Sequence, residues 1–150
     1  MAGAIVIVAS IAFALRVVQI PVAEYETLGD AQADGAFERG WLPIFLPPHA
    51  HSIREAHNVD TNARWLQFAA PVAELRILAA HLATLPYTEA RRTALPRPGR
   101  AGRNWPAELS ESVRITPRST DRLGYFRSPR DAYCLAIEWQ TGNVWGWSCG

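Results

Sequence analysis

The apolar run at the start of the chain is the feature that most constrains its fold. Residues 2–22 are apolar except for Ser10, Arg16 and Gln19. As a helix this run would be roughly 32 Å long, at about 1.5 Å per residue, which is close to the thickness of a bilayer core. Three interpretations fit: an uncleaved anchor in which Arg16 snorkels, a cleaved secretory signal, or a buried helix. We predict a transmembrane helix at residues 1–22, with a signal peptide as the alternative.

The charges that follow this run predict the orientation of the chain. Arg39 is the first basic residue after it, whereas five acidic residues come earlier: Glu24, Glu26, Asp30, Asp34 and Glu38. Because cytoplasmic flanks are usually rich in Arg and Lys, an acidic flank favours the other side of the membrane. We therefore expect the rest of the chain to lie outside the cytoplasm.

The two cysteines predict a disulfide near the C-terminus. Cys134 and Cys149 lie in two β-rich runs on either side of Thr141-Gly142, a pattern typical of a hairpin. A two-residue turn would place them opposite each other as a hydrogen-bonded pair, a less usual site for a disulfide, and a bulge would shift this register. Two buried free thiols are the alternative. Two cysteines alone cannot make a four-ligand zinc site.

The remaining residues, 23–150, predict a single α+β domain. We expect a small mixed or antiparallel sheet with helices on one face and a C-terminal β-hairpin. Before the hairpin, the expected strands are residues 24–28, 41–46 and 63–70, and the expected helices are 30–39, 52–57 and one that begins at Pro71 and ends before Pro86. The helix at 52–57 rests on a capping box formed by Ser52 and Glu55.

Residues 86–130 form an Arg/Pro-rich segment that carries most of the positive charge. The chain has 15 basic residues, no lysine and a net charge of +1, and ten of its arginines fall in this segment. The densest group is Arg91, Arg92, Arg97, Arg100 and Arg103, which we predict to bind a partner. Other subunits of a membrane complex and anionic lipid head groups fit this role, whereas the near-neutral charge and the expected export argue against nucleic acid. An ordinary exposed loop is the alternative.

Alternation of side chains along the hairpin predicts one face that packs in the core and a second face that contains two tryptophans. Leu135, Ile137 and Trp139 share the core face with Val144, whereas Trp145 and Trp147 lie on the opposite face. Two tryptophans on a second face must be covered. The residue 86–130 segment is one candidate cover, and a partner or ligand is the other, in which case both tryptophans are partner-binding residues.

Groups that could support catalysis or bind a metal are few. His49, His51, His57 and Asp60 fall close together, but their spacing does not place three ligands on one face of a short helix. His57 and Asp60 could form an acid–base pair only if the fold brought them together beside a cleft. We predict no catalytic residue, no metal and no cofactor.

Several motifs in the first half of the domain resemble a known family. They are DAQADGAFERGWLP from Asp30, LPP from Leu46 and IREAHNVDTN from Ile53. Over residues 24–85 the chain resembles small exported or membrane-anchored proteobacterial proteins of unknown function that carry a YbbD head-type domain. The resemblance implies export and an α+β head, and it supplies no catalytic residue.

Together these features predict a non-catalytic accessory or assembly subunit of a larger membrane protein complex. It would be a single-pass protein of the bacterial inner membrane whose domain faces the periplasm, and it would act through protein–protein contacts. The alternative is an exported head domain that binds a small ligand. A third possibility is an enzyme that depends on a metal or on His57 and Asp60.

Overall fold

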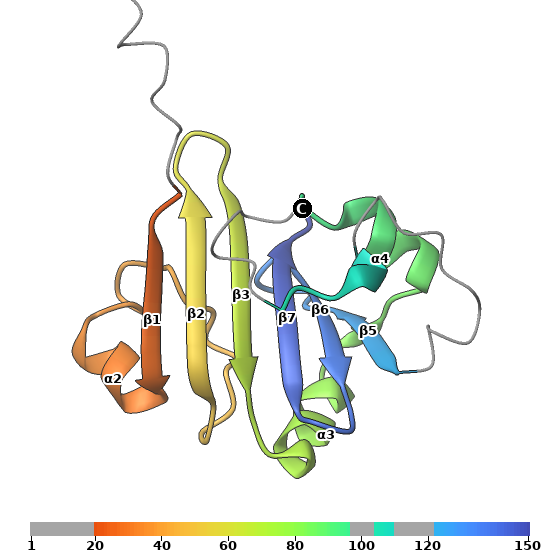
Figure 1. The fold of residues 1–150 in the computed structure, drawn as a ribbon, viewed down its shortest axis with the longest axis horizontal. Helices are drawn as coiled ribbons and strands as arrows, with labels where there is room; N and C mark the ends of the chain where they lie inside the picture. The colour runs from red at the N-terminus through yellow and green to blue at the C-terminus, as the bar shows by residue number, and fades with distance from the viewer. Residues whose placement is uncertain (1–19, 97–103, 110–121) are drawn as a thin grey trace, which may run out of the picture.

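The computed structural model describes residues 20–96, 104–109 and 122–150, and within them seven strands form one antiparallel sheet (Figure 1). The strand order is β1-β2-β3-β7-β6-β5-β4. The strands are β1 (Val22–Thr27), β2 (His51–Asn58), β3 (Ala63–Ala69), β4 (Ala83–Thr84), β5 (Leu123–Arg127), β6 (Tyr133–Glu138) and β7 (Asn143–Ser148); the helices are α2 (Leu28–Ala33), α3 (Val72–Ala80), α4 (Tyr87–Thr93) and the 3-10 turn Ala107–Leu109. The predicted α+β class and antiparallel sheet are confirmed.

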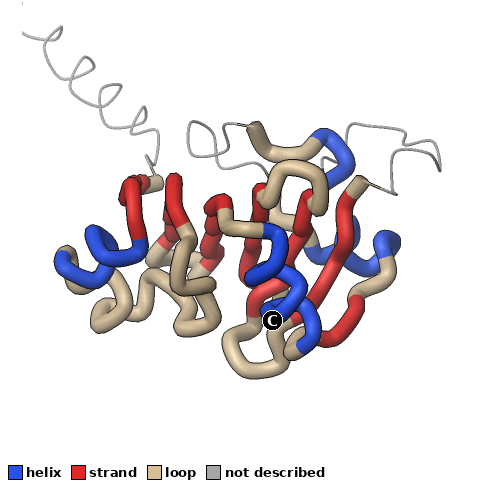
Figure 2. Tube along the Cα trace, turned by 90° about the horizontal axis from the view of Figure 1, so that it is seen from below, coloured by secondary structure: helices blue, strands red, loops and turns tan. Residues whose placement is uncertain are grey.

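Each face of the sheet has its own core and its own cover. On one face, Leu135, Ile137 and Val144 pack with Ala31 of α2 and Leu75 of α3. The opposite face packs under α4 and the 3-10 turn, through buried residues that include Leu85, Ala90, Leu109, Trp145 and Trp147. Figure 2, viewed from below, shows helical segments on both sides of the strands. The prediction of helices on one face is therefore wrong, because both faces of the C-terminal hairpin carry large apolar side chains that need cover.

The hairpin register differs from the predicted one by two residues. Cys134 lies opposite Trp147, because residues 139–142 form a four-residue loop that a hydrogen bond from Gly142 N to Glu138 O closes. Gly142 has a φ of 76°, and a Cβ atom there would lie 2.3 Å from the carbonyl oxygen of Ala70. A shift of two residues keeps every side chain on its face, so the predicted faces are right although the register is not.

The predicted disulfide between Cys134 and Cys149 is present. Because Cys149 follows β7 and lies opposite Ala132, the bond crosses the hairpin diagonally. The two Cα atoms are 5.7 Å apart, within the usual range for a disulfide. The bond therefore ties the segment that follows β7 to β6.

The segment from residue 51 to residue 58 is strand β2, so the predicted helix at 52–57 is wrong. β2 pairs with β1 on one side and β3 on the other, and Ile53 and Glu55 are buried on one face. Two rows of interstrand hydrogen bonds and this burial outweigh one local capping signal. Ser52, with a φ of 51°, lies at a register shift between His51 and Arg54.

Three other expected elements differ in the structure. Residues 41–46 form turns instead of a strand, although Leu42 and Leu46 are buried. The helix expected at 30–39 is the shorter α2, followed by turns in which Gly35 has a φ of 73°. The Arg/Pro-rich segment contains α4 and β5, which its composition did not indicate.

The predicted anchor at residues 1–22 falls mostly outside the described residues, which begin at residue 20. Within the described ranges, no helix is both long enough and apolar enough to cross a membrane.

Removing the disulfide should destabilise the domain. The bond joins residues 15 positions apart, and closing a loop of that length is worth about 3 kcal/mol. We expect the double variant Cys134→Ala/Cys149→Ala to lose about this much unfolding free energy in urea denaturation of the full-length protein in mild detergent. A reductant should lower the stability of the wild type by a similar amount and leave the double variant unchanged. A wild-type protein that is indifferent to a reductant that fully opens the bond would contradict this account.

Candidate functional site

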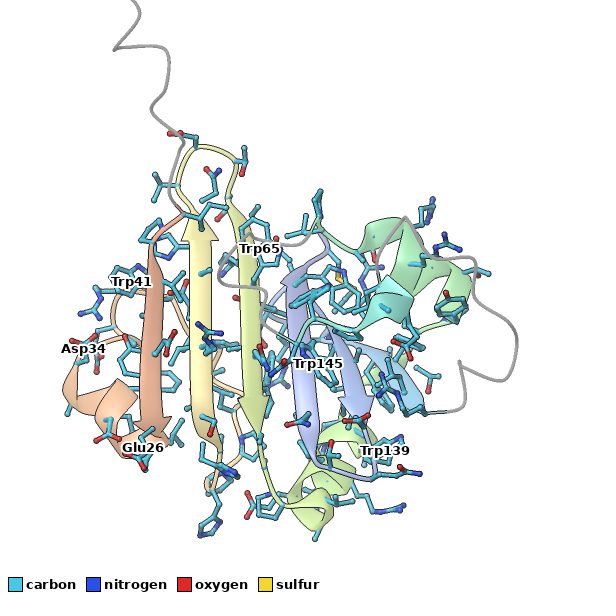
Figure 3. All side chains as sticks on the ribbon, in the orientation of Figure 1. Glu26, Asp34, Trp41, Trp65, Trp139 and Trp145 are labelled. Carbon is cyan, nitrogen blue, oxygen red and sulfur yellow. A yellow bond between two sulfur atoms is a disulfide. The ribbon has the colours of Figure 1, made fainter. Side chains whose placement is uncertain are left out.

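The two tryptophans predicted to bind a partner lie inside the protein. Trp145 is 4% exposed and Trp147 is fully buried. Trp147 Nε1 donates a hydrogen bond to the Thr93 hydroxyl of α4 at 3.4 Å, and the Trp147 and Trp105 rings pack edge to face with their centroids 6.5 Å apart. Figure 3 shows Trp145 in the middle of the sheet, on β7. Their role is to pack α4 and the Trp105 segment onto the sheet, so their assignment to a partner surface is corrected.

The arginines of the predicted partner-binding cluster are only partly described. Arg91 and Arg92 lie in the last turn of α4, where positive charge favours the helix terminus. Arg97, Arg100 and Arg103 lie outside the described residues. A partner role for these five arginines stays a prediction.

Two later arginines of the same segment stabilise the fold. Arg122 bridges Glu108 at 3.0 Å and Glu138 at 2.8 Å. Arg127 donates to the carbonyl oxygen of Cys149 at 2.7 Å. Part of the positive charge of residues 86–130 is therefore used within the domain.

The structure pairs His57 with Glu55 instead of Asp60. His57 Nδ1 lies 2.7 Å from Glu55 Oε1, and Glu55 is 1% exposed. Asp60 lies in the turn between β2 and β3, where its backbone N–H donates to the Asn58 side chain. The acid–base pair considered for an enzyme is thus not the pair that forms. Among the residues that the structure describes, no three His, Cys, Asp or Glu side chains gather as metal ligands.

A polar cluster surrounds Glu55 on the α3 face of the sheet. The Trp41 ring lies 4.9 Å from the His57 ring, and the Arg39 guanidinium stacks on Trp41 at 3.9 Å. Burial raises the pKa of Glu55 above its ordinary value, and the hydrogen bond with His57 opposes this shift. The contact between the Trp41 and His57 rings holds the loop that carries Trp41 against β2.

The same face has a second buried polar group at the start of β6. Among the residues that the structure places, none is a hydrogen-bond partner of the Tyr133 hydroxyl, and burial raises its pKa to about 12. The Arg64 guanidinium lies over the Tyr133 ring at 5.1 Å. Arg64 and Tyr133 continue the polar cluster across the sheet. The Tyr133 ring lies in the core beneath the loop of residues 41–50, where it packs edge to face against Phe45.

An apolar groove lies between α3 and the loop that precedes β2, and it is the candidate functional site. Its volume is about 460 Å³. Its lining residues are Phe45, Leu46, Pro47, Pro48 and His49 of the loop, and Glu74, Ile77, Leu78 and His81 of α3 and its C-terminal cap. A groove of this size with mostly apolar walls is typical of a binding site.

Hydrogen bonds between Glu74 and His49 join the two walls of the groove. The Glu74 carboxylate accepts a hydrogen bond from the backbone N–H of His49 at 3.1 Å and lies 2.5 Å from His49 Nδ1. Desolvation alone would raise the pKa of Glu74, but the hydrogen bonds from His49 hold it below its ordinary value. This contact holds the loop against α3, and the groove is open in the structure of the chain alone.

Large apolar side chains are exposed at this groove. Ile77 in its wall is 64% exposed, and Ile44, next to the lining residue Phe45, is 79% exposed. The sequence held two signals of this surface: Ile77 lies outside the apolar stripe of α3, and Ile44 begins an apolar run that ends in two prolines. Neither signal was used to predict a site.

The comparisons with known proteins concern the first part of the domain. Residues 19–69 match the family model of the YbbD head domain. The predicted resemblance is confirmed over this segment, which covers β1, α2, β2 and β3 and stops short of α3. The loop wall of the groove therefore belongs to the matched segment, and the α3 wall lies outside it. No curated protein and no solved structure matches the chain.

Replacing Glu55 should change how stability depends on pH. Because the folded-state pKa of Glu55 is raised, the folded protein keeps a proton that the unfolded chain releases near its ordinary pKa of 4.5. Stability is therefore lost as pH rises from that value through the folded pKa, at no more than about 1.4 kcal/mol per pH unit. Glu55→Gln removes this loss, so its stability relative to wild type should increase with pH across this window in urea denaturation.

The exposed carboxylate of Glu26 provides the matched control. Glu26→Gln removes a carboxylate from an exposed position of β1 and is measured beside Glu55→Gln. Parallel profiles for Glu55→Gln and wild type would show that Glu55 carries no such shift.

Proposed function

We propose that this protein is a membrane-anchored accessory or assembly subunit whose domain faces the periplasm and binds a partner subunit through the groove between α3 and the loop of residues 45–49. The observation that carries the proposal is the open apolar groove with Ile44 and Ile77 exposed beside it. Exposed apolar surface of this kind typically marks an interaction site. The protein would act by binding and not by catalysis.

The position of the groove supports this role. β1 follows directly from the apolar N-terminal run and starts at the upper end of the sheet in Figure 1. The loop of residues 45–49 leads into the start of β2 at the opposite end, where α3 also lies. An anchor at residues 1–22 would therefore leave the groove at the end of the domain away from residue 22.

The chemistry of the described polar groups also supports a binding role. His57 is engaged with Glu55, and His49 is engaged with Glu74. A disulfide between Cys134 and Cys149 fits an oxidising compartment such as the periplasm.

A small apolar ligand is the second candidate occupant of the groove, because about 460 Å³ lies within the range of small-molecule sites.

Deleting residues 2–22 tests the anchor. If the apolar run holds the protein in the membrane, the shortened chain should move from the membrane fraction to the soluble fraction after cell lysis. The full chain should resist extraction with high salt and carbonate. A shortened chain that stays in the membrane fraction would mean that residues 2–22 are not the anchor.

Ile77→Asp tests the groove. Its side chain is 64% exposed, so the substitution should leave stability within about 0.5 kcal/mol of wild type. A charge in the apolar wall should release the partner, which would lower the mass of the complex extracted from native membranes in mild detergent. Val59→Asp is the matched control, because Val59 is 79% exposed in the turn between β2 and β3 at the other end of the sheet. A wild-type protein that runs alone at its own mass would refute the proposal.

A further inference from the structure

The loop wall of the groove cannot pair with a β-strand. Pro47 and Pro48 have no backbone N–H, and the N–H of His49 is bound by Glu74. An added strand forms hydrogen bonds with every second residue of its neighbour. Because Pro47 and Pro48 are adjacent, one of the two would be at a bonding position in either register, and neither has an N–H to donate. An extended segment would therefore bury unsatisfied backbone carbonyls against this wall.

The α3 wall offers no backbone pairing either. The N–H of Glu74 bonds to the carbonyl of Pro71, and that of His81 bonds to the carbonyl of Leu78. Because helical backbone groups already have their partners, this wall interacts through side chains alone. An occupant must then satisfy its own backbone groups before it enters the groove.

The groove also offers no unengaged carboxylate among its lining residues to hold a polar ligand. Glu74 is the only carboxylate among its lining residues, and both of its oxygens are engaged with His49. The remaining wall of α3 consists of Ile77 and Leu78, with His81 one turn beyond Ile77. The middle of this wall is apolar, and its two ends are polar.

We infer that the groove takes the apolar face of an amphipathic α-helix from the partner subunit. This inference rests on the proposed function and names the structure that the partner presents. A helix pairs its own backbone groups, so it needs only side-chain contacts, which is what both walls provide. Glu74, Ile77, Leu78 and His81 follow the spacing i, i+3, i+4, i+7, so they form one ridge along α3 against which a second helix can pack.

The side chains that line the groove predict which residues the partner helix has on the face that enters it. Its apolar residues would recur at i, i+3 or i+4 and i+7 to fill the groove. Ile44 and Ile77 would contact its flanks, because both are largely exposed. The uncharged middle of the groove disfavours a charged residue at the central apolar position.

Site-specific photo-crosslinking in the full-length protein in native membranes tests this inference. A photoreactive phenylalanine analogue replaces Ile44, Ile77 or His81 in turn, and mass spectrometry locates each crosslinked residue. We expect crosslinks to one partner segment, at positions separated by three or four residues. The same analogue at Val59 is the control and should give no crosslink to that segment.

The other outcomes separate this inference from the proposed function. Crosslinks to a partner at every second residue would indicate an extended segment and overturn the inference while the proposed function stands. Crosslinks to the sequence of this chain itself, in a species of twice its mass, would assign the groove to a second copy and overturn both. Crosslinks to lipid or to a small molecule alone, or none from any groove position, would refute the proposed function.

Discussion

Burial of both faces of β6 and β7 is the constraint on which the rest of the structure depends. All six residues of β6 are buried, as are the four central residues of β7. A strand buried on both faces needs a covering layer on each side. The α3 side covers Leu135 and Ile137, and the α4 side covers Trp145 and Trp147. The two layers, and with them the groove beside α3, follow from this requirement.

Period-two alternation could be predicted from the sequence because it survives an error in register. The hairpin faces were right although the loop is four residues long, since a two-residue shift preserves every face. The helix expected at 52–57 was wrong because a capping box describes only local hydrogen bonds. The neighbours that make residues 51–58 a strand come from β1 and β3, which local sequence does not specify.

Composition misled the interpretation of the Arg/Pro-rich segment. Its prolines and arginines indicated a loop, yet β5 has Leu123 and Tyr125 buried on the Trp145 face with Gly124 between them. A Cβ atom at Gly124 would lie 2.8 Å from Trp139 Nε1, so this glycine leaves room for the Trp139 ring.

The groove could not be predicted, because it is formed by segments that are distant in the sequence. Its walls, residues 45–49 and 74–81, become neighbours only through the tertiary fold, and His49 and Glu74 show no pairing pattern in the sequence.

The strand order has a consequence for how the chain comes to be folded. β7 and β6 lie at the centre of the sheet and join β1–β3 to β5 and β4, although they are the last strands in the sequence. The first three strands therefore lack their inner neighbour, β7, until a segment more than 70 residues further along the sequence has been synthesised, and the disulfide joins β6 to Cys149 just after β7. A domain arranged in this way stays incomplete while it emerges from the ribosome.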